Sequence, residues 1–223
     1  DRIVVQDVQV KLENIEANHF LDEKDVMRLM DYKVENLRGA RYGELDMKTL
    51  EERIKSERYV EDADIYSDLK GNMVVNVSLR RPVARIVRED GPDGYIAEDG
   101  TIMPVSGKFS SRVVVITGSF VNQLIKKQNV LDNPKGRQLL DMLEYIRKDE
   151  FLNAQIAGID MNSKGHIDLY PQVGGQLIEF GEPIDVETKF MKLKIFYKEI
   201  LPSKGWNYYS RVNLEYESQI VAE

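Results

Sequence analysis

Hydrophobic and polar residues alternate along the last segment of the chain, SRVNLEYESQIVAE (210–223). One set of alternate positions reads Val212, Leu214, Tyr216, Ser218 and Ile220, and the positions between them are Asn213, Glu215, Glu217 and Gln219. A period of two predicts a half-buried β-strand of about ten residues. A final strand is often a sheet edge, where unpaired backbone N–H and C=O groups can bind another strand. The segment is therefore a candidate docking edge.

The first part of the chain alternates between strand and helix patterns in the order β-α-α-β-β. Strand patterns cover Ile3–Leu12, residues 60–67 and MVVNVSLRR (73–81). Asp22 and Asp46 each precede apolar residues at helical spacing, so each is expected to cap a helix. The following residue, Pro82, is expected to end the third strand or place it at a sheet edge, because proline has no N–H to donate. The order predicts a complete small α/β module.

Turn residues then mark a change of pattern. REDGPDGYIAEDGTIMP (88–104) contains repeated Asp-Gly pairs and predicts the domain boundary. Beyond it, strands frame a helix that begins at Asn133-Pro134 and a last helix that begins at Asp185 and is stopped by Pro202 and Gly205. The predicted class is α+β, with a module at 1–88 and a mixed-sheet β domain carrying two or more helices at 89–223.

The composition narrows the function classes. With 42% hydrophobic and 31% charged residues, it is typical of a globular protein. The chain has no cysteine, which excludes thiol catalysis, zinc-thiolate sites and iron–sulfur clusters. A net charge of −7 argues against general nucleic-acid binding. No run of apolar residues is long enough to span a bilayer. Because the sequence begins at Asp1 without a methionine, we expect an upstream segment, which can hold an anchor.

Residues suited to catalysis or metal binding are sparse. His19 and His166, the two histidines, are expected to be structural or exposed, since neither has a plausible partner nearby in sequence. The carboxylates of DADIYSD (62–68) and EDGPDG (89–94) lack EF-hand spacing. The glycines of VGGQLIEFG (173–181) lack the spacing of a phosphate-binding loop. We therefore expect no metal and no cofactor, and an enzymatic activity is not favoured.

Four segments resemble motifs of one protein family. VSLRRPVARIV (77–87) resembles the signature that closes a POTRA domain, with Arg80, Arg81, Pro82 and Ala84 at its positions. YIAEDGTIMPVS (95–106), GQLIEFGEPIDVETKFMKLKIFYKEI (175–200) and YYSRVNLEYESQIV (208–221) resemble the segments that follow it. In this order and spacing they are similar to the FtsQ/DivIB family of bacterial cell-division proteins. The resemblance implies a POTRA domain followed by a C-terminal β domain, with the signature residues in structural roles.

The resemblance also implies a function. Proteins of this family are non-catalytic scaffolds of the division machinery, and they link early division proteins to late peptidoglycan synthases of the FtsW/FtsI type. They bind the FtsB/FtsL pair through the last strand and the neighbouring helix, and the POTRA domain contributes to recruitment. The expected location is the inner membrane, with a single spanning helix upstream and this region in the periplasm.

The resemblance places the partner-binding residues on the last strand. They are Arg211, Asn213, Glu215, Tyr216, Glu217, Ser218 and Gln219. Asn213 replaces an aspartate of the family pattern and Glu215 replaces an arginine, whereas Tyr216 matches. Backbone pairing does not depend on these charges. Tyr216 is the main candidate, because a tyrosine offers apolar area and a polar tip, and Leu214 is expected to lie in the core.

Two other functions stay open at this point. A POTRA-containing protein of outer-membrane assembly or secretion usually carries several such modules before a membrane barrel, and this chain has one. A carbohydrate-active enzyme of the cell envelope requires a pair of carboxylates flanking the scissile bond. The chain has 38 acidic residues, but no pair stands out.

Overall fold

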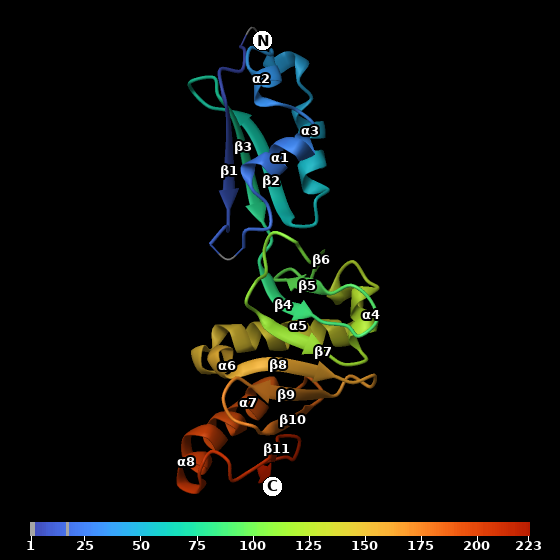
Figure 1. Cartoon of the computed structure of the whole chain (residues 1–223), viewed down its shortest axis with the longest axis vertical. Coiled ribbons are helices and arrows are strands. Elements are labelled where there is room, and N and C mark those ends of the chain that lie inside the picture. Colours follow the sequence, from blue (N-terminus) through green and yellow to red (C-terminus); the bar gives the residue numbers. More distant parts are fainter. Residues whose placement is uncertain (1–2, 17) are drawn as a thin grey trace. The chain divides into compact units, whose positions relative to one another are not determined.

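The computed structural model describes residues 3–16 and 18–223, and the chain divides into two compact units. Unit 1 comprises Asp1–Arg81 and Ser106–Ser111, and unit 2 comprises Pro82–Val105 and Arg112–Glu223. Each unit combines helices with one sheet (Figure 1). The predicted α+β class is confirmed.

Unit 1 is built on a three-stranded sheet in the order β1-β3-β2. The strands are β1 (Val8–Glu13), β2 (Val60–Ser67) and β3 (Met73–Leu79). The central strand β3 is parallel to β1 and antiparallel to β2. The helices are α1 (Glu23–Met30), α2 (Val34–Leu37), the 3-10 turn η1 (Tyr42–Glu44) and α3 (Met47–Lys55). The predicted β-α-α-β-β order is confirmed, with the single-turn α2 and η1 added between the two longer helices.

The two longer helices of unit 1 begin at the predicted caps. The side chain of Asp22 accepts the N–H of Asp25 at 2.8 Å, and Asp25 accepts the N–H of Asp22 at 2.9 Å. Asp46 caps α3 by accepting the N–H of Thr49 at 3.1 Å. Each cap satisfies a backbone donor that a helix leaves free at its first turn. The buried core between helices and sheet includes Val26, Met30, Leu50, Ile54, Val75, Val77 and Leu79.

The first strand is shorter than predicted, since it begins at Val8 instead of Ile3. Val5 bonds through its backbone to Gly39 and Ala40, at 2.8 and 2.9 Å. Val4 forms a bridge with Arg41. Val4 and Val5 therefore pair with the loop after α2, whereas Gln6 and Asp7 still bond to Gly71 and to Met73 at the start of β3.

Residues 106–111 belong to unit 1 because their side chains pack on α1 and its surroundings. Lys108 donates to both carboxylate oxygens of Asp25, at 2.7 and 2.8 Å. The ring of Phe109 lies edge-on to Phe20, with the centroids 5.2 Å apart. Asp25 thus serves both the cap of α1 and this segment.

Unit 2 is a nine-stranded sheet in the order β12-β11-β10-β9-β8-β7-β4-β5-β6. The strands are β4 (Pro82–Ile86), β5 (Gly94–Ala97), β6 (Ile102–Pro104), β7 (Val114–Thr117), β8 (Ile156–Met161), β9 (Ile167–Pro171), β10 (Leu177–Gly181), β11 (Arg211–Asn213) and β12 (Val221–Ala222). The β4-β7, β7-β8 and β10-β11 pairs are parallel, and the other pairs are antiparallel. The sheet is therefore mixed, as predicted.

The helices of unit 2 cover one side of this sheet, and Figure 1 shows α5 and α7 behind its strands. They are α4 (Val121–Ile125), η2 (Val130–Asp132), α5 (Pro134–Lys148), α6 (Glu150–Gln155), α7 (Val186–Ile195), the π-helical turn η3 (Phe196–Ile200) and α8 (Leu201–Lys204). The predicted start of α5 is confirmed, since Asn133 accepts the N–H of Lys135 at 2.9 Å. Pro202 does not stop the last helix, because the π-helical turn η3 leads directly into α8; the helix ends at Gly205, which has a φ of 102°.

The division between the units falls between Arg81 and Pro82, whereas the sequence places the boundary at 88/89. The difference is strand β4. The third strand, β3, ends at Leu79 and is central in its sheet, and Pro82 begins β4, which lies between β5 and β7 in the larger sheet. Ala84 of β4 is fully buried there.

Candidate partner-binding site

The C-terminal segment forms the last two strands of the larger sheet. β11 is parallel to β10, with Val212 opposite Ile178, and β12 is antiparallel to β11, with Ala222 opposite Val212. The prediction of one continuous strand over residues 211–221 is wrong. β11 already has a neighbour on each side, so a partner strand has no access to it while β12 is in place.

Local hydrogen bonds explain why the strand breaks. Leu214 donates its N–H to Glu179 at 2.9 Å and buries its side chain completely. The N–H of Glu215 then turns to the side-chain oxygen of Asn213 at 2.8 Å. This Asx-type bond satisfies a donor that a continuing strand would direct to its neighbour. Ser218 has a φ of 57°, a left-handed conformation that reverses the chain before β12.

β12 is the last strand of the sheet, and Ala222 is its residue whose backbone groups face the free edge. Arg211 and Glu223 exchange two backbone hydrogen bonds, at 3.1 and 3.0 Å. In an antiparallel pair, residues alternate between such bonded pairs and pairs whose N–H and C=O groups point away from each other. Val212 and Ala222 form the next pair. The N–H and C=O of Ala222 therefore point away from β11, and within the described residues no strand pairs with that side of β12.

The structure brings the seven predicted partner residues together, on β11 and the turn that follows it. Arg211 forms an ion pair with Glu179, and this contact raises the pKa of the Arg211 guanidinium. Asn213 donates to the other oxygen of Glu179 at 3.1 Å. The carboxylate of Glu215 lies over Gly181, in space that a larger residue would fill. Tyr216 is 54% exposed. The remaining three, Glu217, Ser218 and Gln219, are exposed in the turn.

Lys192 of α7 contacts this turn from the helix side. Its Nζ donates to the carbonyl of Leu214 at 2.5 Å and to that of Tyr216 at 2.7 Å. Partial burial lowers the pKa of this lysine. Lys192 could not be recognised from the sequence, because its partners are backbone atoms of a segment more than twenty residues away.

A row of polar residues crosses the solvent side of the same sheet. Thr117, Asp160, Asp168, Glu179 and Asn213 are neighbours on successive strands from β7 to β11. Burial raises the pKa of Asp168, and the negative charges of Glu179 and Asp160 raise it further. Like charges on directly opposed residues destabilise a sheet. No local pattern of residues indicates this row, since its members come from five separate strands.

The four signature residues lie where unit 1 gives way to unit 2 in the chain. Arg80 donates to the carbonyls of Arg58 and Val60 beside β2. Arg81 donates to the side-chain oxygen of Asn14 at 2.6 Å. These two arginines therefore bind backbone and loop atoms of unit 1, and Pro82 and Ala84 belong to β4.

Neither histidine belongs to the strands β11 and β12 or to the turn between them. His19 contacts the ring of Phe109 edge-on, with the centroids 5.4 Å apart. His166 follows the turn at Asn162, whose side chain accepts its backbone N–H at 3.1 Å. Among the described residues, no group of three or more His, Asp or Glu side chains is arranged to hold a metal ion. Within the same residues, the helices are too short or too polar to cross a bilayer.

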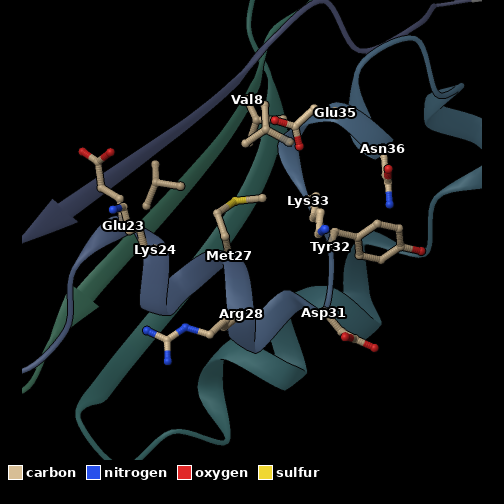
Figure 2. A pocket seen from close by; sticks show the side chains of 12 residues that line it. Val8, Glu23, Lys24, Met27, Arg28, Asp31, Tyr32, Lys33, Glu35 and Asn36 are labelled. Carbon is tan, nitrogen blue, oxygen red and sulfur yellow. The ribbon is translucent and has the colours of Figure 1, made fainter.

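Unit 1 contains a groove of about 680 Å³ between β1 and α1. Figure 2 shows Met27 pointing from α1 toward the strands, and the apolar part of the lining also includes Val8 and Val10 of β1 and Val34 of α2. The rim carries both charges, from Glu23, Lys24, Arg28, Asp31, Lys33 and Glu35. None of the predicted partner-binding residues lines this groove.

Comparison with protein-family models places both parts of the chain. Residues 3–78 match the model of a POTRA-like domain, and residues 81–223 match a model described as FtsQ/DivIB, C-terminal related. A search of curated proteins finds no match. The second model covers more than half of the chain and confirms the resemblance of the sequence motifs. The chain therefore belongs to the FtsQ/DivIB-related family of cell-division proteins.

Proposed function

We propose that this protein is a non-catalytic scaffold of the division machinery, which binds the FtsB/FtsL pair by strand addition at the free edge of β12. Membership of the family supports the scaffold role. In this proposal the full-length protein is anchored in the inner membrane and presents both units to the periplasm. It links its partners to peptidoglycan synthases of the FtsW/FtsI type.

The observation that carries the docking proposal is the direction of the backbone groups of Ala222. They point away from β11 at the end of the sheet. An extended segment of FtsB that lies beside β12 can exchange two hydrogen bonds with Ala222, each contributing about 0.5–1.5 kcal/mol net. The proposed docking edge is therefore β12 alone and not a strand over residues 211–221.

In this proposal, exposed apolar side chains of the turn and of α7 supply the remaining affinity. Tyr216 projects from the turn with its ring exposed. On α7, which holds the turn through Lys192, Met191 and Ile195 are exposed one helical turn apart. Because a two-residue strand offers few backbone bonds, these apolar groups must contribute much of the binding energy. The roles assigned to Arg211, Asn213, Glu215, Glu217, Ser218 and Gln219 stay predictions.

The decisive experiment changes one backbone donor at the edge. In Ala222→Pro the outward N–H is lost and a ring occupies its place, whereas Ala222→Val keeps the N–H and adds only side-chain volume. We expect the proline variant of the intact chain to bind the periplasmic segment of FtsB at least tenfold more weakly, about 1.4 kcal/mol. The valine variant should bind nearly as well as the wild type. Isothermal calorimetry measures both affinities.

Two further measurements are needed to interpret the affinities. Two-dimensional NMR spectra of the free variants must show an unchanged fold of unit 2. Equal affinity of folded Ala222→Pro and wild type would contradict strand addition at β12, while leaving the scaffold role standing. No measurable binding of FtsB or FtsL by the wild type would contradict the partner assignment itself.

A further inference from the structure

The side chain of Lys192 joins helix α7 to the segment that separates β11 from β12. Its Nζ bonds to the carbonyls of Leu214 and Tyr216, two residues apart. The carbonyls stand on either side of Glu215, where the chain leaves the sheet. One cation therefore holds both ends of the bend.

The two contacts are strong for a lysine at the surface. Lys192 is partly buried, and burial lowers its pKa. A lysine ammonium has three donors and no acceptor, so a single Nζ can serve two carbonyls and keep one donor for water. Hydrogen bonds from a charged donor are stronger than those between neutral groups.

The same bonds restrict where a partner can pair. With Lys192 in place, the carbonyls of Leu214 and Tyr216 already have a donor. The first backbone groups after the bend that the register directs outward are those of Ala222. Residues 214–220 do not form a strand, so an incoming strand can pair with β12 but not along the bend that Lys192 holds.

We propose that Lys192 is a positioning residue for partner binding, which fixes the bend at 214–216 and so sets the position of both Tyr216 and the β12 edge. This inference rests on the proposed function for its effect on affinity. Its effect on the free protein does not, because the two hydrogen bonds exist without a partner.

The test compares three variants of the intact chain. Lys192→Met keeps the length and apolar part of the side chain but removes every donor, and Lys192→Arg keeps charge and donors. Lys198→Met is the matched control, because Lys198 lies on the turn following α7, with its Nζ 5.8 Å from the ring centre of Phe151. Hydrogen exchange of amides 214–223 and the affinity for the periplasmic segment of FtsB are measured for each.

In Lys192→Met, we expect amides 219–223 to exchange at least tenfold faster while α5 exchanges unchanged. We also expect affinity for FtsB to fall at least fivefold. Lys192→Arg and Lys198→Met should stay within twofold of the wild type in both measurements. Unchanged exchange in Lys192→Met, or an arginine variant as impaired as the methionine variant, would overturn the positioning role.

The two proposals fail in different ways. If the wild type does not bind FtsB, the proposed partner is wrong, and the exchange measurement still decides whether Lys192 holds the edge. If Lys192→Met loosens residues 219–223 but binds FtsB with wild-type affinity, partner binding does not depend on the position of the bend. The positioning proposal then fails while the partner assignment stands.

Discussion

Asn213 donates its side-chain N–H to Glu179, its neighbour across β10 and β11, at 3.1 Å. Glu179 also accepts a hydrogen bond from Arg211, which precedes Asn213 by two residues on β11. The family pattern has an aspartate where this chain has Asn213. The structure explains the exchange, because a carboxylate at 213 would extend the row of Asp160, Asp168 and Glu179 by a fourth negative charge.

Asn213→Asp should therefore destabilise unit 2. The change removes the hydrogen bond to Glu179 and places like charges on directly opposed residues, which together cost about 1 kcal/mol. The free energy of unfolding is measured by urea denaturation at pH 7 and at pH 3, followed by the fluorescence of Trp206. At pH 3 the loss should shrink, because the carboxyls are then largely protonated. An equal loss at both pH values would assign it to the missing hydrogen bond alone.

Asp168→Asn should raise the free energy of unfolding of unit 2, whereas Asn213→Asp lowers it. Burial, Glu179 and Asp160 all raise the pKa of Asp168 above 3.8, so ionisation of this group opposes folding. The cost is absent below the unfolded-state pKa and grows as pH rises toward the raised folded-state value. We expect the variant to be more stable at pH 7 by a few tenths to about 1 kcal/mol, since the group is partly exposed and screened. Stability at pH 3 should be unchanged, and reduced stability at pH 7 would contradict the argument.

Local signals in the sequence placed several elements correctly. Asp22, Asp46 and Asn133 accept backbone N–H groups at the starts of α1, α3 and α5. A helix cap acts over three residues, so its signal is contained in the sequence around it. The β-α-α-β-β order could be predicted for the same reason.

The end of the chain could not be predicted in this way. The alternation from Val212 to Ile220 fits one long strand, and no glycine or proline marks a turn there. The strand ends because Asn213 binds the N–H of Glu215 and because Lys192 binds the carbonyls that follow. The second interaction is tertiary, so it overrides a period of two that is otherwise regular.

Ser218 offers a direct test of this bend. Its left-handed φ of 57° suits glycine and is incompatible with proline, whose φ is fixed near −65°. Ser218→Gly should leave the free energy of unfolding within about 1 kcal/mol of the wild type. Ser218→Pro should lower it by about 2–3 kcal/mol and free β12 from β11. Thermal unfolding and hydrogen exchange of residues 219–223 measure both effects.

The expected effect of Ser218→Pro decides which proline variant can test partner binding. A proline at Ser218 weakens binding by disrupting the bend, so it cannot report on strand pairing. Ala222→Pro acts on a donor that makes no bond within β11 and β12, and it is the more specific change. Wild-type stability in Ser218→Pro would show that the bend adopts another conformation in solution.

Lys108 and Asp25 provide a prediction for unit 1. Burial raises the pKa of Asp25, but the hydrogen bonds from Lys108 and Asp22 outweigh it and hold the pKa below 3.8. The ionised carboxylate therefore stabilises unit 1 above the unfolded-state pKa, and this stability is lost as pH falls through the lowered folded-state value. Lys108→Met should cost about 1 kcal/mol at pH 7, since Lys108 is half exposed.

The measurement must follow unit 1 itself, because the single tryptophan, Trp206, lies in unit 2. Hydrogen exchange of the α1 amides in the intact chain reports the local free energy of opening at each pH. In Lys108→Met the loss on acidification should be smaller than in the wild type, since less of the stability depends on the charge of Asp25. Lys24→Met is the control. Lys24 lies on α1 beside Asp25 in sequence but lines the groove, whereas Lys108 binds the carboxylate of Asp25. A matching loss in both variants would place the effect in α1 as a whole and not in the contact between Lys108 and Asp25.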